Sequence, residues 1–349
     1  MTGDLETLFG IDAPIVLGPF GGMSSIPLTA SISEAGGLGS FGLYGYPGER
    51  IRETAAALRA ATGRPFALNL WLPTGDEVEP GDTDLAGARA AIAPLLGAAG
   101  VAPPPLPESF LPPLDEQLDA VWDAAPAVLS VVFGVPAAET VAEAHRRGIR
   151  VVGTATSVAE AVALAAGGVD AIVASGAEAA GHRVSFLRRA EESLVGTVAL
   201  VPQVVDAVDV PVIAAGGIAD RRGVAAAFAL GAAGVQVGSA FLRTRQSAAS
   251  EAHRTALRAA ADTDTVLTRA MSGRLARGIP NRAVRAIEEA DAVAPFPAQN
   301  WLTAAFRAAA PNDADLISMW AGQAAGLSRS EDAEEVFAEL AAGIPARPH

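Results

Sequence analysis

Short apolar runs alternate along this chain with alanine-rich segments of helical character, at a fairly regular spacing. The apolar runs are rich in Val, Ile and Leu and are continuous, whereas a half-exposed strand alternates apolar and polar residues. Continuous runs of this kind are typical of parallel strands that are covered on both faces. Eight candidate strands result: Pro14–Leu17, Leu38–Phe41, Phe66–Leu70, Val128–Phe133, Arg150–Gly153, Ala171–Ala174, Val210–Ala215 and Gly234–Val237.

The helical segments between these strands have recognisable ends. Ser157 followed by Glu160 predicts a capping box at the start of one helix. Asp220 predicts the N-cap of another, and glycines mark the end of both. Strands and helices that alternate over this length predict an α/β fold. Eight repeats favour a closed (β/α)8 TIM barrel, and a doubly wound open sheet is the alternative.

Two stretches depart from this repeat. Residues 73–127 are rich in proline and acidic residues and are too long for a simple connection. We therefore expect an insertion after the third strand that carries one or two helices. It either covers the catalytic mouth or is a plain surface insertion. After about residue 245 the pattern is helical without strands. The expected division is a barrel over 1–245, which includes the insertion, and a helical region over 246–349 packed on it.

Composition excludes several kinds of chemistry. The chain of 349 residues has no cysteine, and its 25 Lys and Arg residues are all arginine. Thiolate nucleophiles, zinc–thiolate and iron–sulfur sites, disulfides and lysine Schiff bases are therefore excluded, and we expect no metal site. A formal net charge of −14 argues against nucleic acid and anionic membranes as partners.

The chain also lacks the pattern of a signal peptide, because its first residues carry acids and no basic region. The uncharged run from Gly223 to Leu242 is long enough to raise the question of a membrane segment. Its glycines, Gln236 and Ser239 divide it into a helix, a turn and a short strand. We therefore expect buried core there, and a soluble, cytoplasmic protein without membrane partners.

The segment Asp170–Ser185, DAIVASGAEAAGHRVS, places His182 on a small-residue loop directly after a strand. His145 and His253 lie in charged helical contexts, where we expect them to be solvated, and His349 is the last residue. A histidine held on such a loop is well placed for acid–base chemistry near neutral pH. A histidine that only caps the loop is the alternative.

Glycine-rich ends of two strands predict a phosphate site. Gly216 and Gly217 follow the seventh strand just before a helix, and Gly238 and Ser239 follow the eighth. In a barrel these strands are neighbours, and their loops form a common phosphate site. Glycines let backbone N–H groups approach the phosphate. Since no dinucleotide fingerprint occurs, a mononucleotide is favoured over NAD.

Three further strand ends point to the same mouth of the barrel. The backbone of Leu17–Met23, LGPFGGM, can lie against a flat ring. Asn69 offers a donor and an acceptor at the C-terminal face, with a loop cap as the alternative. Phe133 is either pocket wall or core, and the same choice is open for Tyr44, Tyr46 and Trp71.

Six segments, taken in order, resemble a known family: Pro14–Gly42, Pro65–Trp71, Gly176–Arg183, Ser185–Val208, Val210–Leu242 and Ser272–Arg282. They resemble the nitronate monooxygenases, formerly called 2-nitropropane dioxygenases, which are FMN-dependent TIM-barrel enzymes. The resemblance covers most of the chain except the proline-rich insertion and the tail. It is specific for the superfamily and less so for the reaction, because flavin-dependent enoyl-acyl carrier protein reductases share the barrel and a similar histidine loop.

The resemblance implies roles for individual residues. It makes His182 the catalytic base or a substrate-facing histidine. This chain departs from the family with Ser175 where glutamine is common, Ala180 and Val184 where glycine is common, and Phe20 in place of a usual methionine. These changes bear on substrate identity more than on flavin binding. The expected flavin contacts are Pro19, Phe20, Gly21, Asn69, Ser175, Ala180, Gly181, Gly217, Gln236, Val237, Gly238 and Ser239.

Our first hypothesis from the sequence is FMN-dependent oxidation of an alkyl nitronate, or of a nitroalkane, by O2 to a carbonyl compound and nitrite. The alternative is a reductase that passes hydride from NADH or NADPH to an enoyl thioester or a quinone. A third hypothesis is a flavin- or phosphate-binding protein without catalysis. The expected partners are the small-molecule substrate and O2, and the oligomeric state stays open.

Overall fold

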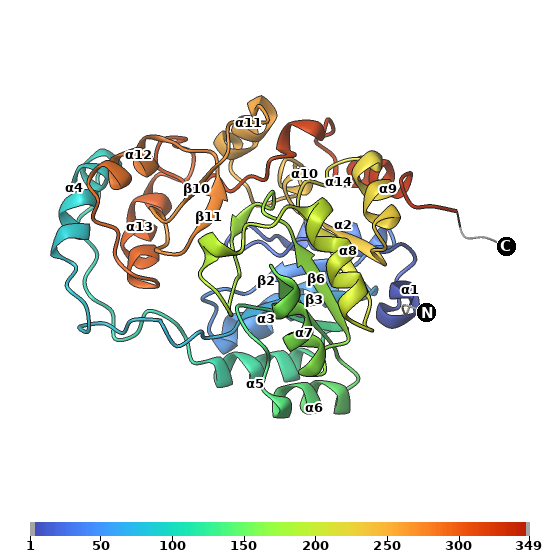
Figure 1. Ribbon diagram of the computed structural model, residues 1–349. Helices are drawn as coiled ribbons and strands as arrows, with labels where there is room; N and C mark the ends of the chain where they lie inside the picture. Colours follow the sequence, from blue (N-terminus) through green and yellow to red (C-terminus); the bar gives the residue numbers. More distant parts are fainter. Residues whose placement is uncertain (1–3, 347–349) are drawn as a thin grey trace.

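The computed structural model describes residues 4–346, and a sheet of eight parallel strands forms its centre (Figure 1). Their order is β1-β9-β8-β6-β5-β4-β3-β2. A parallel bridge between Val16 and Leu38 joins the first strand to the second, so the sheet closes. The prediction of a (β/α)8 TIM barrel is confirmed, and every predicted segment overlaps one strand: β1 (Ile15–Leu17), β2 (Gly39–Gly42), β3 (Phe66–Trp71), β4 (Val128–Val132), β5 (Arg150–Ala155), β6 (Ala171–Ser175), β8 (Val212–Ala215) and β9 (Gly234–Val237).

Helices cover the outside of the barrel, and their ends follow the local sequence. The Ser157 hydroxyl accepts a hydrogen bond from Glu160 N at 3.3 Å. The Asp220 carboxylate caps the next predicted helix start, accepting from Arg222 N at 2.9 Å. Both predicted N-caps are therefore confirmed. The helices on the outer face are α2 (Ile26–Glu34), α3 (Gly48–Ala61), α5 (Leu114–Ala124), α6 (Ala138–Arg146), α7 (Val158–Ala166), α8 (Thr197–Ala207), α9 (Arg221–Ala229) and α14 (Ala333–Ala341).

The N-terminal end of the barrel is closed by α1 (Leu5–Phe9). Its buried Leu5 and Phe9 belong to one apolar cluster with Val16, Val128 and Ile213 from the barrel strands. The opposite end, where the strands finish, stays free for a site, as in other TIM barrels.

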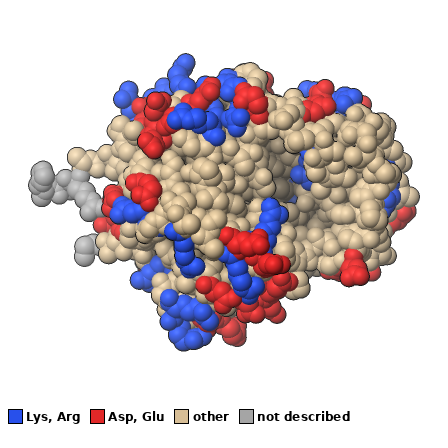
Figure 2. Space-filling view, turned by 180° about the vertical axis from the view of Figure 1, so that it is seen from behind, with Lys and Arg blue, Asp and Glu red and all other residues tan. Residues whose placement is uncertain are grey.

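The insertion carries two helices, α4 (Ala86–Ala99) and α5, which go to different places. α5 packs against α3 on the barrel. α4 instead packs against α12 (Arg282–Glu289) and α13 (Ala298–Ala309). We call α4, α12 and α13 the helical lobe; they share an apolar core of their own. The lobe lies to the left of the barrel in Figure 1, and the surface is hollowed between the two in Figure 2.

The expectation that the chain is helical without strands after residue 245 is wrong. β10 (Val266–Thr268) and β11 (Ala276–Gly278) form an antiparallel sheet with β7 (Gly181–His182). Each strand has at most three residues, which is too short for a periodicity to show. The remaining elements are the helices α10 (Ser239–Leu242) and α11 (Glu251–Ala259) and the 3-10 turns η1 (Ala190–Glu192) and η2 (Ala325–Leu327).

The uncharged run from Gly223 to Leu242 forms most of α9, then β9 and α10. Its apolar side chains, among them Val224, Val235 and Phe241, lie in the barrel core as expected. Within residues 4–346, no helix has the length and apolar character needed to span a membrane.

Candidate active site

A cavity of about 480 Å³ lies at the C-terminal ends of the barrel strands, within the usual size range of small-molecule sites. Its walls come from the strand ends, from residues 175–184, and from α13 of the helical lobe. Val237 alone among the predicted site residues does not line it, because its side chain is buried in the barrel core. Those that line it are Pro19, Phe20, Gly21, Asn69, Ser175, Ala180, Gly181, His182, Gly217, Gln236, Gly238 and Ser239.

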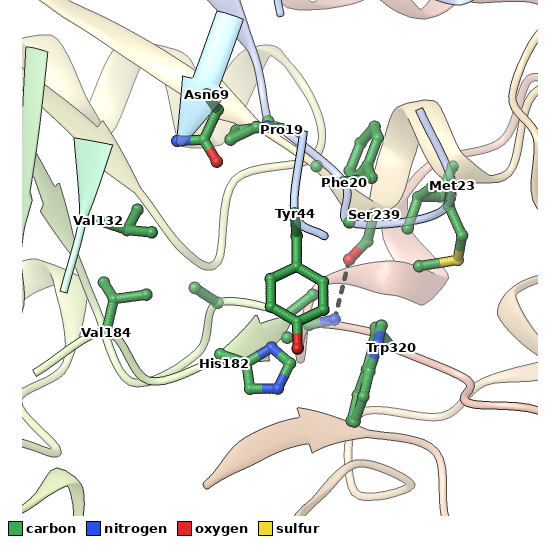
Figure 3. A pocket seen from close by; sticks show the side chains of 18 of the residues that line it. Pro19, Phe20, Met23, Tyr44, Asn69, Val132, His182, Val184, Ser239 and Trp320 are labelled. Carbon is green, nitrogen blue, oxygen red and sulfur yellow. Dashed lines mark hydrogen bonds between the residues drawn. The ribbon is translucent and has the colours of Figure 1, made fainter. Parts of the chain in front are cut away.

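One wall of the cavity presents polar atoms without hydrogen-bond partners among residues 4–346. Asn69 Nδ2 donates to Ser130 Oγ at 2.7 Å, which leaves its Oδ1 for a ligand. Figure 3 shows the Asn69 side chain projecting into the pocket. The side chains of Ser175, Thr154 and Gln236 also line the cavity and make no hydrogen bond within residues 4–346. Such a wall suits a ring with alternating donors and acceptors.

The glycines after β8 form a tight turn beside this wall. Gly216 has φ of 103° and Gly217 has φ of 72°, in the left-handed region that favours glycine. A Cβ at Gly216 would lie 3.0 Å from Thr197 Oγ1 and 3.2 Å from Ala179 N. The Glu178 carboxylate holds Thr197 by accepting from its Oγ1 at 2.9 Å. The turn is therefore fixed, with its backbone at the cavity surface.

After β9, the Ser239 hydroxyl accepts from Gly322 N at 2.9 Å (Figure 3). Its own O–H remains available to a ligand, since a hydroxyl carries one donor beside its acceptor pairs. The two glycine-rich strand ends predicted to share a phosphate site thus both reach the cavity.

His182 lies on β7, with its side chain in the cavity. Its Nε2 lies 2.8 Å from Ser272 Oγ. Ser272 Oγ also lies 3.1 Å from Arg274 O. With the serine proton donated to that carbonyl, we assign Nε2–H as the donor toward the serine, which leaves the lone pair on Nδ1. Burial, followed by the positive charges of Arg274 and Arg307, lowers the pKa of His182 to about 3. The imidazole is therefore neutral at physiological pH and a weak base.

Aromatic rings surround His182. The Trp71 ring meets it edge-on with centroids 4.9 Å apart, and the Trp320 ring lies 5.3 Å away. Figure 3 shows the Tyr44 hydroxyl directed toward His182. Tyr44, Tyr46 and Trp71, left open from the sequence, all line the cavity. These rings contribute to the burial that lowers the pKa of His182.

Arg274 lies behind the aromatic rings around His182 and connects them to the insertion. Its guanidinium sits 4.4 Å from the ring centre of Phe133 and 4.0 Å from that of Phe296. Its Nη2 donates to Asp76 Oδ1 at 2.7 Å and to Glu77 Oε1 at 2.6 Å. Phe133 is thus buried support and not a lining residue. No residue of 73–127 lines the cavity; α4 packs behind α13.

The expectation that His253 is solvated is wrong. It is 1% exposed, and its Nε2 bonds to Trp320 O at 3.0 Å. Burial lowers its pKa to about 4. The charged residues around it in the sequence are on the outer face of α11, whereas His253 faces inward. His145 is 40% exposed and pairs with Asp170, as expected for a surface histidine.

Sequence reasoning missed several polar residues of this region, among them Thr154, Ser272, Asn300 and Arg307. Ser272 lies in a segment that carries the family resemblance, but its contact with His182 depends on pairing between β7 and β11. Asn300 and Arg307 lie seven residues apart on α13, and both line the cavity. That spacing places them on one face of a helix, a signal too common to single them out. The barrel and its cavity are those of a TIM-barrel enzyme.

Comparison with known proteins narrows this class. The family described as nitronate monooxygenase matches residues 3–343. A "probable nitronate monooxygenase" of Staphylococcus aureus (strain Newman) is 37% identical, over 96% of this chain and 95% of the relative. The solved structure of a nitroalkane oxidase from Streptomyces ansochromogenes matches with a TM-score of 0.85 and 34% identity, over 97% of this chain and 96% of that chain. FabK from Thermotoga maritima matches with a TM-score of 0.75 and 28% identity, over 97% and 95%.

The chain belongs to the nitronate monooxygenase family. It is an oxidoreductase of a flavoprotein family whose members oxidise nitro compounds. The expected family and class of enzyme are therefore confirmed.

Proposed function

We propose that this protein catalyses the FMN-dependent oxidation of alkyl nitronates by O2 to a carbonyl compound and nitrite. The observation that carries the proposal is His182, a neutral imidazole whose Nδ1 has no partner among residues 4–346, in a cavity beside polar atoms that are free for a ligand. In the balanced reaction, two nitronate ions and one O2 yield two carbonyl molecules and two nitrite ions.

The residues around the cavity fit FMN. The free Oδ1 of Asn69 and the unpaired Ser175, Thr154 and Gln236 offer hydrogen bonds to the edge of a flavin ring. The turn at Gly216 and Gly217 and the Ser239 hydroxyl offer donors to its single phosphate. When bound, the flavin takes electrons from the substrate and passes them to O2.

His182 handles the proton in this proposal. A neutral nitroalkane must lose its α-proton, and Nδ1 is the unprotonated site that would take it, but a pKa of about 3 makes the ring a weak base for that step. A nitronate is already ionised, so the same ring needs only to contact it. Trp71 and Trp320 keep water away from this point.

The test is a titration of the flavin-loaded protein with propionate 3-nitronate without oxygen, followed by its visible spectrum, and then turnover in air. We expect bleaching of the flavin band and release of nitrite. With a neutral nitroalkane as substrate, His182→Asn should keep the bound FMN but lower turnover at least about 100-fold if the side chain acts as base. His145→Asn, on the surface, is the matched control and should keep normal turnover.

A flavin that ignores the nitronate but is rapidly reduced by NADPH would overturn the proposal in favour of a reductase of enoyl thioesters or quinones. A flavin that responds to neither would point to a binding protein.

A cytoplasmic location stays a proposal that rests on the sequence.

A further inference from the structure

Arg307 is a cavity residue whose charge has no counter-ion. Its Nη2 donates to Asn300 O at 3.0 Å and to Asn300 Oδ1 at 2.8 Å, and its Nε is buried without a partner. Within residues 4–346 it forms no ion pair with any Asp or Glu. Arg274, the other arginine that acts on His182, does not line the cavity and is paired with Asp76 and Glu77. Arg50 lines the cavity as well, but it is exposed and its guanidinium lies 3.8 Å from the centre of the Tyr46 ring, whereas Arg307 is the more buried of the two.

An uncompensated guanidinium in an enclosed site is costly, because burial removes its hydration. Burial lowers the pKa of Arg307 to about 10, so the group stays protonated at neutral pH. Two neutral oxygens of Asn300 do not offset the desolvation cost of the guanidinium. An anion in the cavity does, through a charge-assisted hydrogen bond.

The surroundings of Arg307 extend this preference for an anion. Asn300 Nδ2 donates to Tyr44 Oη at 3.1 Å, so the Tyr44 O–H is left to donate elsewhere. Burial raises the pKa of Tyr44 to about 12, which keeps that proton in place. In Figure 3 this hydroxyl points toward His182. Arg307, Asn300 and Tyr44 thus form one polar cluster, which we call the anion cluster, beside His182.

We propose that Arg307, carried by the helical lobe, recognises the negative charge of the substrate and selects the nitronate anion over the neutral nitroalkane. The inference rests on the proposed function and deepens it, by assigning the choice between the two forms of substrate to one residue. His182 is neutral and does not discriminate charge. The proposed phosphate end is built from other elements: Gly216 and Gly238 follow β8 and β9, whereas Arg307 and Asn300 lie on α13.

The experiment compares ethylnitronate and nitroethane as substrates of the FMN-loaded protein. Each is added from a separately prepared stock and followed before the two forms interconvert. Arg307→Gln should lower kcat/KM for the nitronate about 30-fold or more, chiefly through KM. For neutral nitroethane we expect a loss of about threefold or less, because no charge attraction is removed. Arg307→Lys, which keeps the charge, should recover most of the nitronate activity.

Arg285→Gln on the exposed face of α12 is the matched control, since it removes an arginine from the same lobe away from the cavity. Equal losses on both substrates in Arg307→Gln, or no recovery with Arg307→Lys, would overturn the inference. Either result would assign the arginine to packing of the lobe.

A second measurement separates this inference from the proposed function. Nitrate is a planar anion with the same arrangement of oxygens as a nitro group, and its binding to the FMN-loaded protein can be measured by calorimetry without turnover. We expect binding that weakens at least about tenfold in Arg307→Gln. If the protein oxidises neither nitro compound, the proposed function fails, while nitrate still decides whether Arg307 binds an anion. Unchanged nitrate binding in Arg307→Gln would overturn the inference.

Discussion

The Nε2 atom of His182 lies 2.8 Å from Ser272 Oγ, although 90 residues separate the two in the chain. The contact exists because β11 pairs with β7, with Ala276 opposite His182. Ser272 in turn accepts from Arg274 N at 3.3 Å and donates to Arg274 O at 3.1 Å. The serine is therefore held in one orientation and fixes which nitrogen of the imidazole faces the substrate.

Replacing Ser272 by alanine should release this orientation. We expect Ser272→Ala to lower kcat about tenfold or more with little change in bound FMN, because a misdirected base loses its geometry while the flavin wall is untouched. Steady-state kinetics and the flavin spectrum measure the two quantities. Ser109→Ala, in an exposed loop, is the control. A Ser272→Ala enzyme with normal kcat would show that His182 holds its tautomer without this contact.

The barrel was predictable from the sequence because its strands are buried on both faces. Ile15–Leu17 and Val212–Ala215, for example, are continuous apolar runs, a local signal that requires no knowledge of the partner strand. The glycines of the proposed phosphate site were predictable for a similar reason, since Gly216 and Gly217 directly follow one strand and Gly238 directly follows another. Their role in binding FMN stays a prediction.

What could not be predicted depends on contacts between distant segments. β7 and β11 are too short to be seen without each other, and His253 is buried because α11 turns it toward Trp320. Arg307 lines the cavity only because the helical lobe places α13 against the barrel mouth. In each case tertiary packing determines the position of the residue, and the surrounding sequence is charged or shows no pattern that would indicate it.

Arg274 should affect the basicity of His182. Its positive charge is one of the causes, after burial, that hold the pKa of His182 near 3. Arg274→Gln removes the charge, so we expect the pKa of His182 to rise and the acidic limb of the kcat/KM profile to move to higher pH. The pKa that this acidic limb reports should stay below 6.5, since burial still opposes protonation of His182. Arg274→Lys, which keeps a positive charge, should leave the limb near its original position; an unmoved limb in Arg274→Gln would contradict the prediction.

Two glycines with left-handed backbones allow a matched test of the phosphate turn. Gly216 has φ of 103° and a Cβ there would meet Thr197 Oγ1 at 3.0 Å, whereas Gly75 has φ of 85° with open space around it. Both alanine variants pay a backbone cost of about 1 kcal/mol. Only Gly216→Ala should also disturb the turn, so we expect weaker FMN binding in that variant alone, measured by fluorescence titration. Equal FMN affinity in the two variants would remove Gly216 from the binding turn.

His253 should make the protein less stable in acid. Its pKa is about 4 in the folded protein, chiefly through burial, against 6.5 as the ordinary value. As pH falls, the unfolded chain therefore takes up the proton first, and folding stability is lost from pH 6.5 down to about 4. Above pH 6.5, His253 adds nothing to the pH dependence of the free energy of unfolding. The slope for one proton is about 1.4 kcal/mol per pH unit at most.

His253→Gln tests this assignment, because a glutamine amide can still donate to Trp320 O but does not titrate. Urea unfolding at several pH values between about 8 and 4 gives the free energy of unfolding for each protein. We expect the variant to lose less stability than the natural protein across that window, whereas His145→Asn on the surface should follow the natural protein. His182 contributes in the same direction through its own low pKa, so a residual slope is expected in His253→Gln. An identical slope in both proteins would mean that His253 does not remain neutral in the fold, and that the bond to Trp320 O carries a charged imidazole.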